Sequence, residues 1–159
     1  MKPLPDMAQP LPGWVRPPSD GFTADDLDRL PALPRHGQLL DGSLMFPGPQ
    51  TNFHSLSVDL MVLGLRRAAP DEWRVRRQMT VILGRRQRPE PDVIVIRADA
   101  DSAPHRIAYH AADVVLAVEV MSADSDVRDR ERKSQLYAEA GISHSWRVES
   151  DSDRPVVRF

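Results

Sequence analysis

The chain has 159 residues, 41% of them hydrophobic and 28% charged, with a formal net charge of −2 and no cysteine. Such values are typical of one soluble globular domain, and they exclude disulfide scaffolds and cysteine chemistry. The longest apolar runs, LMVLGL and VVLAV, are too short to span a bilayer, and the N-terminus lacks the apolar stretch of a signal peptide. We therefore expect no membrane association and a cytoplasmic location.

The chain is expected to start with a disordered segment. Residues 1–20 contain six prolines, so we predict a disordered proline-rich stretch there and one folded domain over residues 21–159. Thr23, with Asp26 three residues later, forms a sequence similar to a capping box. This pair predicts a short helix over residues 24–30.

A hairpin and a longer helix come next. The segment GQLLDGSLMF has apolar residues on both sides of Asp41 and Gly42, a dipeptide that favours a two-residue β-turn. Further along, Asn52 is a candidate N-cap for a helix that continues to Ala69 and stops before Pro70.

The second half of the chain predicts several strands and one helix. The strand segments are rich in β-branched and apolar residues, and they are EWRVRRQMTVIL (72–83), DVIVI (92–96), DVVLAVEVM (113–121), SHSWRV (143–148) and PVVRF (155–159). A polar loop is expected over residues 99–112, and a helix over 126–140 that ends at Gly141. This order predicts an α/β or α+β fold with a mixed central sheet flanked by helices.

Basic residues are concentrated in one part of the chain. Residues 66–88 contain eight arginines and two acidic residues, a local charge of +6 within a protein of net charge −2. Such a stretch could face nucleic-acid phosphates, although a charge run is more often only a solvated surface.

Lysine is rare in this chain, and one lysine has an unusual position. Of the 21 basic residues only Lys2 and Lys133 are lysines. Leu136, Tyr137 and Ala140 follow Lys133 at offsets of three, four and seven residues. This spacing places Lys133 on the apolar face of the predicted helix, towards the core.

Two carboxylates precede this lysine beside apolar strands. Asp92 begins DVIVI, and Glu119 lies in VVLAVEVM, whose two faces are both apolar, as in a strand covered on both sides. If these strands are neighbours, Asp92, Glu119 and Lys133 converge at one end of the sheet. The spacing leaves two interpretations open: a functional site, or a strand-capping aspartate beside a buried Glu119–Lys133 salt bridge.

The functional interpretation is a metal site. Two carboxylates and a backbone carbonyl, here that of Val120, form an oxygen ligand set suited to Mg²⁺ or Mn²⁺. Such an ion activates water and neutralises charge on a scissile phosphate. Lys133 would orient that water or stabilise the phosphoryl oxygens.

Three segments occur together and in order: RRQRPEPDVIVIRAD, VVLAVEVMSADS and RDRERKSQLYAEAGISHSWRVE. In this combination, over residues 22–159, the chain resembles the Uma family of putative restriction endonucleases, within the PD-(D/E)XK nuclease superfamily. The resemblance implies a restriction-endonuclease-like core and Mg²⁺- or Mn²⁺-dependent cleavage of phosphodiester bonds.

The resemblance also implies roles for particular residues. Asp92 matches the aspartate of the PD element, and Glu119 matches the acid of the (D/E)XK element. The usual lysine position is Met121 here, so Lys133 matches those members whose lysine has moved to the next helix. Where the family has a further glutamate on its first helical segment, before the LLDG hairpin, this chain has Gln38, which implies only a weak, uncharged metal ligand.

Two other residues near these motifs are not assigned to the site. His54 is a lone histidine without a second ligand at helical spacing, which favours a packing or surface role. Tyr137 could reach the site from one turn beyond Lys133, but core packing is the prediction for it.

Functions of different classes remain open. The first is a metal-dependent endonuclease that binds nucleic acid, with DNA expected, through the stretch 66–88 and acts as a homodimer because one small subunit cuts one strand. The second is a catalytically degenerate nuclease fold that serves as a binding or interaction module, with Gln38 marking the loss of a ligand. A third is a metal-dependent hydrolase that acts on something other than DNA.

Overall fold

The computed structural model describes residues 16–122 and 127–159, with side chains for all of these except 127–130. The disorder predicted for residues 1–20 falls mostly outside this part of the chain and stays a prediction. None of the helices described is long and apolar enough to cross a membrane.

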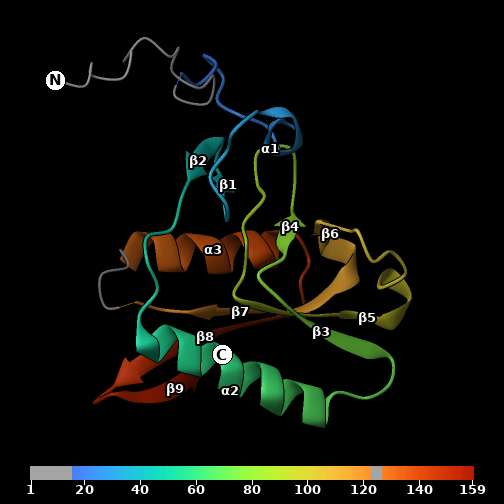
Figure 1. Cartoon of the computed structure of the whole chain (residues 1–159), viewed down its shortest axis with the longest axis vertical. Helices are drawn as coiled ribbons and strands as arrows, with labels where there is room; N and C mark the ends of the chain where they lie inside the picture. The colour runs from blue at the N-terminus through green and yellow to red at the C-terminus, as the bar shows by residue number, and fades with distance from the viewer. Residues whose placement is uncertain (1–15, 123–126) are drawn as a thin grey trace, which may run out of the picture.

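A five-stranded mixed sheet forms the centre of the molecule (Figure 1). Its strands, in spatial order, are β3 (Trp73–Arg77), β5 (Val93–Arg97), β7 (Val114–Val120), β8 (His144–Asp151) and β9 (Arg154–Arg158). The neighbouring pairs are antiparallel except β7 and β8, which are parallel. This arrangement confirms the predicted mixed sheet, and it makes β5 and β7 neighbours.

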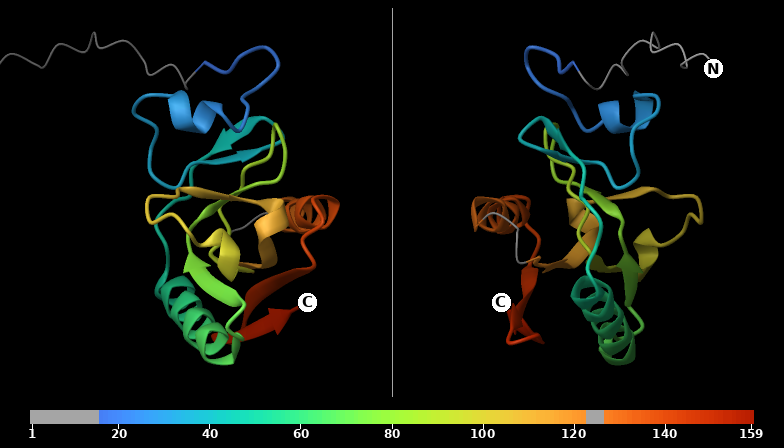
Figure 2. Two further views of the ribbon diagram at one scale, coloured as in Figure 1. Left: turned by 90° about the vertical axis from the view of Figure 1, so that its right-hand side faces the viewer. Right: turned by 60° about the vertical axis from the view of Figure 1, so that its left-hand side comes forward.

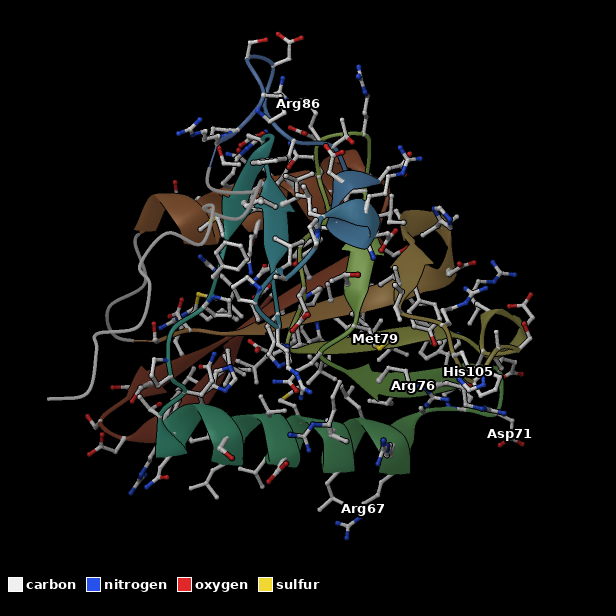
Figure 3. All side chains as sticks on the ribbon, turned by 45° about the horizontal axis from the view of Figure 1, so that its top comes forward. Arg67, Asp71, Arg76, Met79, Arg86 and His105 are labelled. Carbon is white, nitrogen blue, oxygen red and sulfur yellow. The ribbon has the colours of Figure 1, made fainter. Side chains whose placement is uncertain are left out.

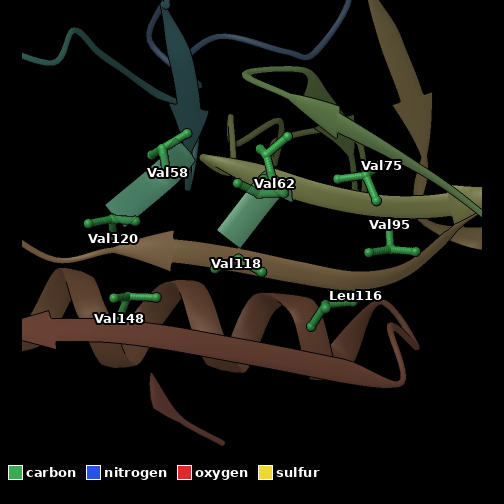
Figure 4. Packing of buried hydrophobic residues seen from close by; sticks show 9 residues of the cluster. Val58, Val62, Val75, Val95, Leu116, Val118, Val120 and Val148 are labelled. Carbon is green, nitrogen blue, oxygen red and sulfur yellow. The ribbon is translucent and has the colours of Figure 1, made fainter. Parts of the chain in front are cut away.

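Two helices cover the opposite faces of this sheet, as Figure 1 shows. Helix α2 (Asn52–Ala68) packs through Val58 and Val62 against the valines of the central strands (Figure 4). Helix α3 (Val127–Glu139) connects β7 to β8 and places the fully buried Tyr137 in the core of the other face. A parallel strand pair requires such a crossover, because the chain must return to the same end of the sheet.

The central strand β7 has an apolar core on each side. Leu116, Val118 and Val120 belong to the core that α2 covers, whereas Ala117 belongs to the core that α3 covers. Side chains alternate along a strand, so Glu119 points to the α3 side. The prediction that this strand is covered on both faces is confirmed.

The N-terminal part adds a further layer on the α3 side (Figure 2). It contains the one-turn helix α1 (Asp26–Arg29) and the hairpin of β1 (Gln38–Leu40) and β2 (Ser43–Met45). It rests on a small parallel sheet made by β4 (Thr80–Ile82) and β6 (Ala108–His110). The Thr23 backbone N–H donates to Asp26 Oδ2 over 2.7 Å, and the hairpin turns at Asp41 and Gly42, as predicted.

Three details of the predicted elements were wrong. The expected strand 72–83 is two strands, because Gln78 adopts a positive φ of 48° and redirects the chain from the central sheet into the small one. The expected loop 99–112 contains β6, which pairs with β4. Helix α2 is capped by Thr51 rather than Asn52, since the Thr51 side chain accepts from the His54 N–H.

The arginine-rich stretch 66–88 does not form one phosphate-facing surface. Arg88 is only 3% exposed and binds Asp28, Thr80 and the Ala24 carbonyl, so it holds the N-terminal layer in place. Figure 3 shows Arg67 on the outer side of α2, far from Arg86 at the tip of the β4 region. For Arg88 the prediction of a nucleic-acid contact was wrong, because a run along the sequence is divided among several layers of the fold.

Two glycines provide a matched test of the hairpin turn. Gly42 has a φ of +79°, and an added Cβ would clash with the Arg86 guanidinium. Gly64 lies in α2 with open space around it. We expect Gly42→Ala to lower the free energy of unfolding by about 1–2 kcal/mol and Gly64→Ala to raise it by about 0.5–1 kcal/mol. Denaturant unfolding of both variants checks this, and equal effects would contradict the strained turn.

Candidate functional site

A polar cleft opens where β5 begins and β7 ends. Its volume is about 470 Å³, and its walls come from the β1–β2 hairpin, the loop 46–50, the start of α2 and one face of α3. Val93 pairs with Val118 across β5 and β7, so Asp92 is brought next to the last residues of β7. The cleft thus collects segments that are separated by up to about a hundred residues in sequence.

Asp92 is held at the base of this cleft from two sides. Its Oδ2 accepts the backbone N–H of Val120 over 2.7 Å, which ties the carboxylate to the end of β7. Its Oδ1 lies 2.8 Å from Nε2 of His54, a side chain that is only 7% exposed. The orientation of Asp92 is therefore set by the main chain of one strand and the first turn of α2.

Glu119 is the most deeply buried acid of the site, with 6% exposure. Its Oε2 lies 3.0 Å from Nζ of Lys133, and its Oε1 accepts the Tyr137 hydroxyl over 2.5 Å. Burial raises the pKa of Glu119, while Lys133 and the Tyr137 hydroxyl act in the opposite direction. Both carboxylate oxygens are thus satisfied from α3, as a buried charge requires.

Helix α3 is also tied to the β1–β2 hairpin, which forms another wall of the cleft. Arg132, the neighbour of Lys133, donates through Nε and Nη2 to the two oxygens of Asp41 over 2.9 and 2.6 Å. The hydrogen bond from Arg132 is the main reason that the pKa of Asp41 falls to about 2. This bidentate pair sets the distance between the hairpin and the helix that carries Lys133.

A third carboxylate lies in the same cleft. Glu90 Oε1 is 2.6 Å from Nδ1 of His36, and the Glu90 backbone N–H donates to Oε1 of Gln38 over 3.1 Å. Burial raises the pKa of Glu90, and the nearby Asp92 adds to that rise. The amide oxygen of Gln38 therefore helps to position Glu90, and this hydrogen bond occupies one of the lone pairs of that oxygen.

The structure brings the predicted site residues together. Asp92, Glu119, Lys133, Val120 and Gln38 all line the cleft. Gln38 lies on strand β1 of the predicted hairpin, and not on a helical segment as the family resemblance implied for its glutamate.

Three contributors were missed in the sequence. Tyr137 packs in the core as predicted, but its hydroxyl also binds Glu119. The partner of His54 is 38 residues away, and that of Glu90 is 54 residues away. For His54 a signal was available, because Ser57 and Val58 at offsets of three and four mark the inner face of α2.

The carboxylate and carbonyl oxygens of the cleft fit a hard divalent cation that is bound by few protein ligands. Among the described residues no three His, Asp or Glu side chains are close enough to enclose a metal ion. Asp92 and Glu119 each keep lone pairs beyond their hydrogen bonds, because a carboxylate can accept about four. Mg²⁺ is commonly held by one or two carboxylates, with water and phosphate oxygens completing the shell. Two acids and the carbonyl of Val120 at an open cleft match that pattern.

Comparison with known proteins agrees with this architecture. A sequence family described as "Putative restriction endonuclease", Uma2, matches residues 24–157. A crystal structure from Anabaena variabilis, described as "a putative nuclease belonging to DUF820", has a TM-score of 0.63 at 14% identity and shares 86% of this chain and 83% of its own. At that identity the likeness shows the fold alone. Among curated proteins no relative matches the chain.

The two tyrosines of the chain allow the Glu119 contact to be tested. We expect Tyr137→Phe to lower the free energy of unfolding by about 1.5–3 kcal/mol, because it removes a buried hydrogen bond to a charged group. Tyr109→Phe is the control, since its hydroxyl lies 3.3 Å from Asp101 and contributes less. Thermal or denaturant unfolding gives both values, and an effect of Tyr137→Phe no larger than that of the control would contradict the contact.

The His54–Asp92 pair predicts a pH dependence of stability. The hydrogen bond to Asp92 raises the pKa of His54 above its ordinary 6.5. Its stabilisation is therefore fully present below that unfolded-state value and is lost as the pH rises through the higher folded-state value. We expect His54→Gln to cost more stability at about pH 6 than at about pH 8.5, in chelator-treated buffer. In an Asp92→Asn background this difference should vanish, and its persistence would assign the effect to another group.

Proposed function

The chain belongs to the Uma2 family, described as "Putative restriction endonuclease", and from this and the geometry of the cleft we propose that it is a metal-dependent endonuclease. It would hydrolyse phosphodiester bonds of nucleic acid, with DNA as the expected substrate. The residues proposed to carry the reaction are Asp92, Glu119 and Lys133. All three act at the base of the cleft, where β5 begins and β7 ends.

The single observation that supports this proposal best is the arrangement of Asp92, Glu119 and Lys133. Side-chain exposures of 15%, 8% and 15% place all three at the base of one polar cleft. A salt bridge kept only for stability would gain little over apolar side chains. Such a bridge also does not require a second carboxylate beside it at a cavity, so the additional Asp92 favours a site.

The proposed metal ligands are Asp92, Glu119 and the main-chain carbonyl of Val120, with Gln38 as a weak further oxygen ligand. A bound Mg²⁺ or Mn²⁺ supplies a water of lowered pKa and offsets negative charge on the phosphate. Val120 N–H and His54 keep Asp92 in one orientation, so the carboxylate needs no reorganisation when the ion binds.

Lys133 has two proposed tasks. It neutralises Glu119, with Nζ 3.0 Å from Oε2. Its ammonium group can donate further hydrogen bonds into the cleft, to a phosphate oxygen or to the attacking water. Tyr137 holds the other oxygen of Glu119, so Lys133 can turn to substrate without leaving that acid unpaired.

The substrate would enter beside a basic side chain of the loop that precedes the β1–β2 hairpin. Arg35 is exposed and lines the same cleft as Lys133. Both cations line the cleft and suit a phosphate backbone that binds there. Exposed members of the stretch 66–88 would add contacts that depend on salt but not on base sequence.

Metal binding and cleavage can be separated by two substitutions. We expect the wild type to bind Mn²⁺ and Mg²⁺ in calorimetry, to gain thermal stability from the ion and to cleave DNA in its presence. Asp92→Ala should lose both binding and cleavage. Lys133→Met should keep a measurable ion affinity but lower the cleavage rate by about a hundredfold or more.

Lys2→Ala, which changes the other lysine of the chain, serves as the control and should cleave at the wild-type rate. A folded wild type that binds no ion at millimolar concentration would contradict the proposal and favour the degenerate binding module. Ion binding with cleavage of RNA or small phosphoesters, but not of DNA, would instead identify a hydrolase with another substrate.

A further inference from the structure

Helix α2 has an apolar outer face as well as an apolar inner face. Leu56, Leu60 and Leu63 are 64%, 59% and 48% exposed, and their spacing of four and three residues aligns them in one stripe. The inner face already packs against the sheet through Val58 and Val62. A surface helix normally presents polar residues outwards, so three exposed leucines in register indicate a contact surface.

The described part of the chain leaves this stripe uncovered. Figures 1 and 2 show α2 along the outer edge of the molecule, with the sheet on one side and no helix or strand on the other. The cleft does not use the stripe either, because the α2 residue that lines it, His54, lies on the inner side of the helix. The proposed nuclease activity therefore gives no account of these leucines.

We propose that this face is a homodimer interface in which two copies of α2 pack antiparallel about a twofold axis. Leu60 of each copy would lie against Leu63 of the other, as apolar seam residues do in paired helices. The proposal concerns the association of two chains and does not rest on the proposed nuclease function.

Charge complementarity indicates that a second copy of the chain covers the leucine stripe, and it sets the direction of the second α2 helix. Asp59 and Arg66 are both exposed and lie seven residues apart, so they flank the leucine stripe on the same side. In the antiparallel pair, Asp59 of each copy lies beside Arg66 of the other, with an offset along the helix axis of only about 3 Å. A parallel pair would instead place the Asp59 and Arg66 flanks of the two copies on opposite sides of the seam, where these charges could not pair across it. The ion pair with Arg77 leaves the Asp59 side chain 60% exposed, so the acid is available for this contact.

The interface would be small, and the dimer should be correspondingly weak. Three leucines and two ion pairs belong to the lower end of specific interfaces, so we expect a dissociation constant on the order of micromolar. The antiparallel arrangement separates the two copies of His54, and with them the two clefts, by about 22 Å along the helix axis.

Sedimentation of the full chain across a concentration series tests the proposal. The wild type should pass from monomer to dimer as its concentration increases, and Leu60→Glu should stay monomeric with an unchanged free energy of unfolding, since Leu60 is already exposed. Ile107→Glu is the matched control, because Ile107 is 66% exposed elsewhere on the surface and its loss should leave the dimer intact.

A charge exchange tests the direction of the helices. Asp59→Arg alone should weaken the dimer several-fold, and Asp59→Arg combined with Arg66→Asp should restore it. A wild type that stays monomeric at all concentrations, or a dimer that Leu60→Glu leaves intact, overturns the interface. If Leu60→Glu dissociates the dimer, but the double exchange does not restore the affinity that Asp59→Arg alone removes, the antiparallel arrangement is overturned.

Discussion

Glu119 is buried in the central strand β7, and its charge has to be compensated by the elements packed around it. A carboxylate with 6% exposure in the central strand is costly unless its charge is compensated and its oxygens are hydrogen-bonded. Lys133 and Tyr137 meet both requirements, and both come from the helix that follows this strand. The acid thereby fixes the rotation of α3, because only one face of that helix carries both groups. Lys133 is brought to the cleft as a consequence of this pairing.

Around this pair, the cleft is assembled from polar contacts that cross between layers. The bidentate contact of Arg132 with Asp41 ties α3 to the hairpin, and the contact of His54 with Asp92 ties α2 to the start of β5. Each contact joins residues that are distant in the sequence but carry opposite or complementary groups. The base of the cleft is therefore held from several sides, and this preorganisation supports the proposal of a cation site there.

The distribution of charge shows why composition alone is a poor guide to partners here. The most basic stretch of the chain supplies a buried structural cation, Arg88, as well as exposed arginines on separate faces. The apolar residues show the same division, since α2 is hydrophobic both towards the core and towards solvent. In each case the sequence records the residue type, and the fold decides whether that residue stabilises the interior or is available for another molecule.

The sequence was enough to predict the main strands, both long helices, the hairpin and the inward direction of Lys133, because each of these depends on periodicity and turn residues close by in the chain. It also identified Asp92 and Glu119, since an acid beside a run of buried β-branched residues stands out locally. The contact of His54 with Asp92 and the place of Glu90 in the cleft follow from the fold, because the partners of these residues are 38 and 54 residues away. The fold also determines the break between β3 and β4 at Gln78 and the pairing of β6 with β4, since a strand's partner is set by long-range packing rather than by its own residues.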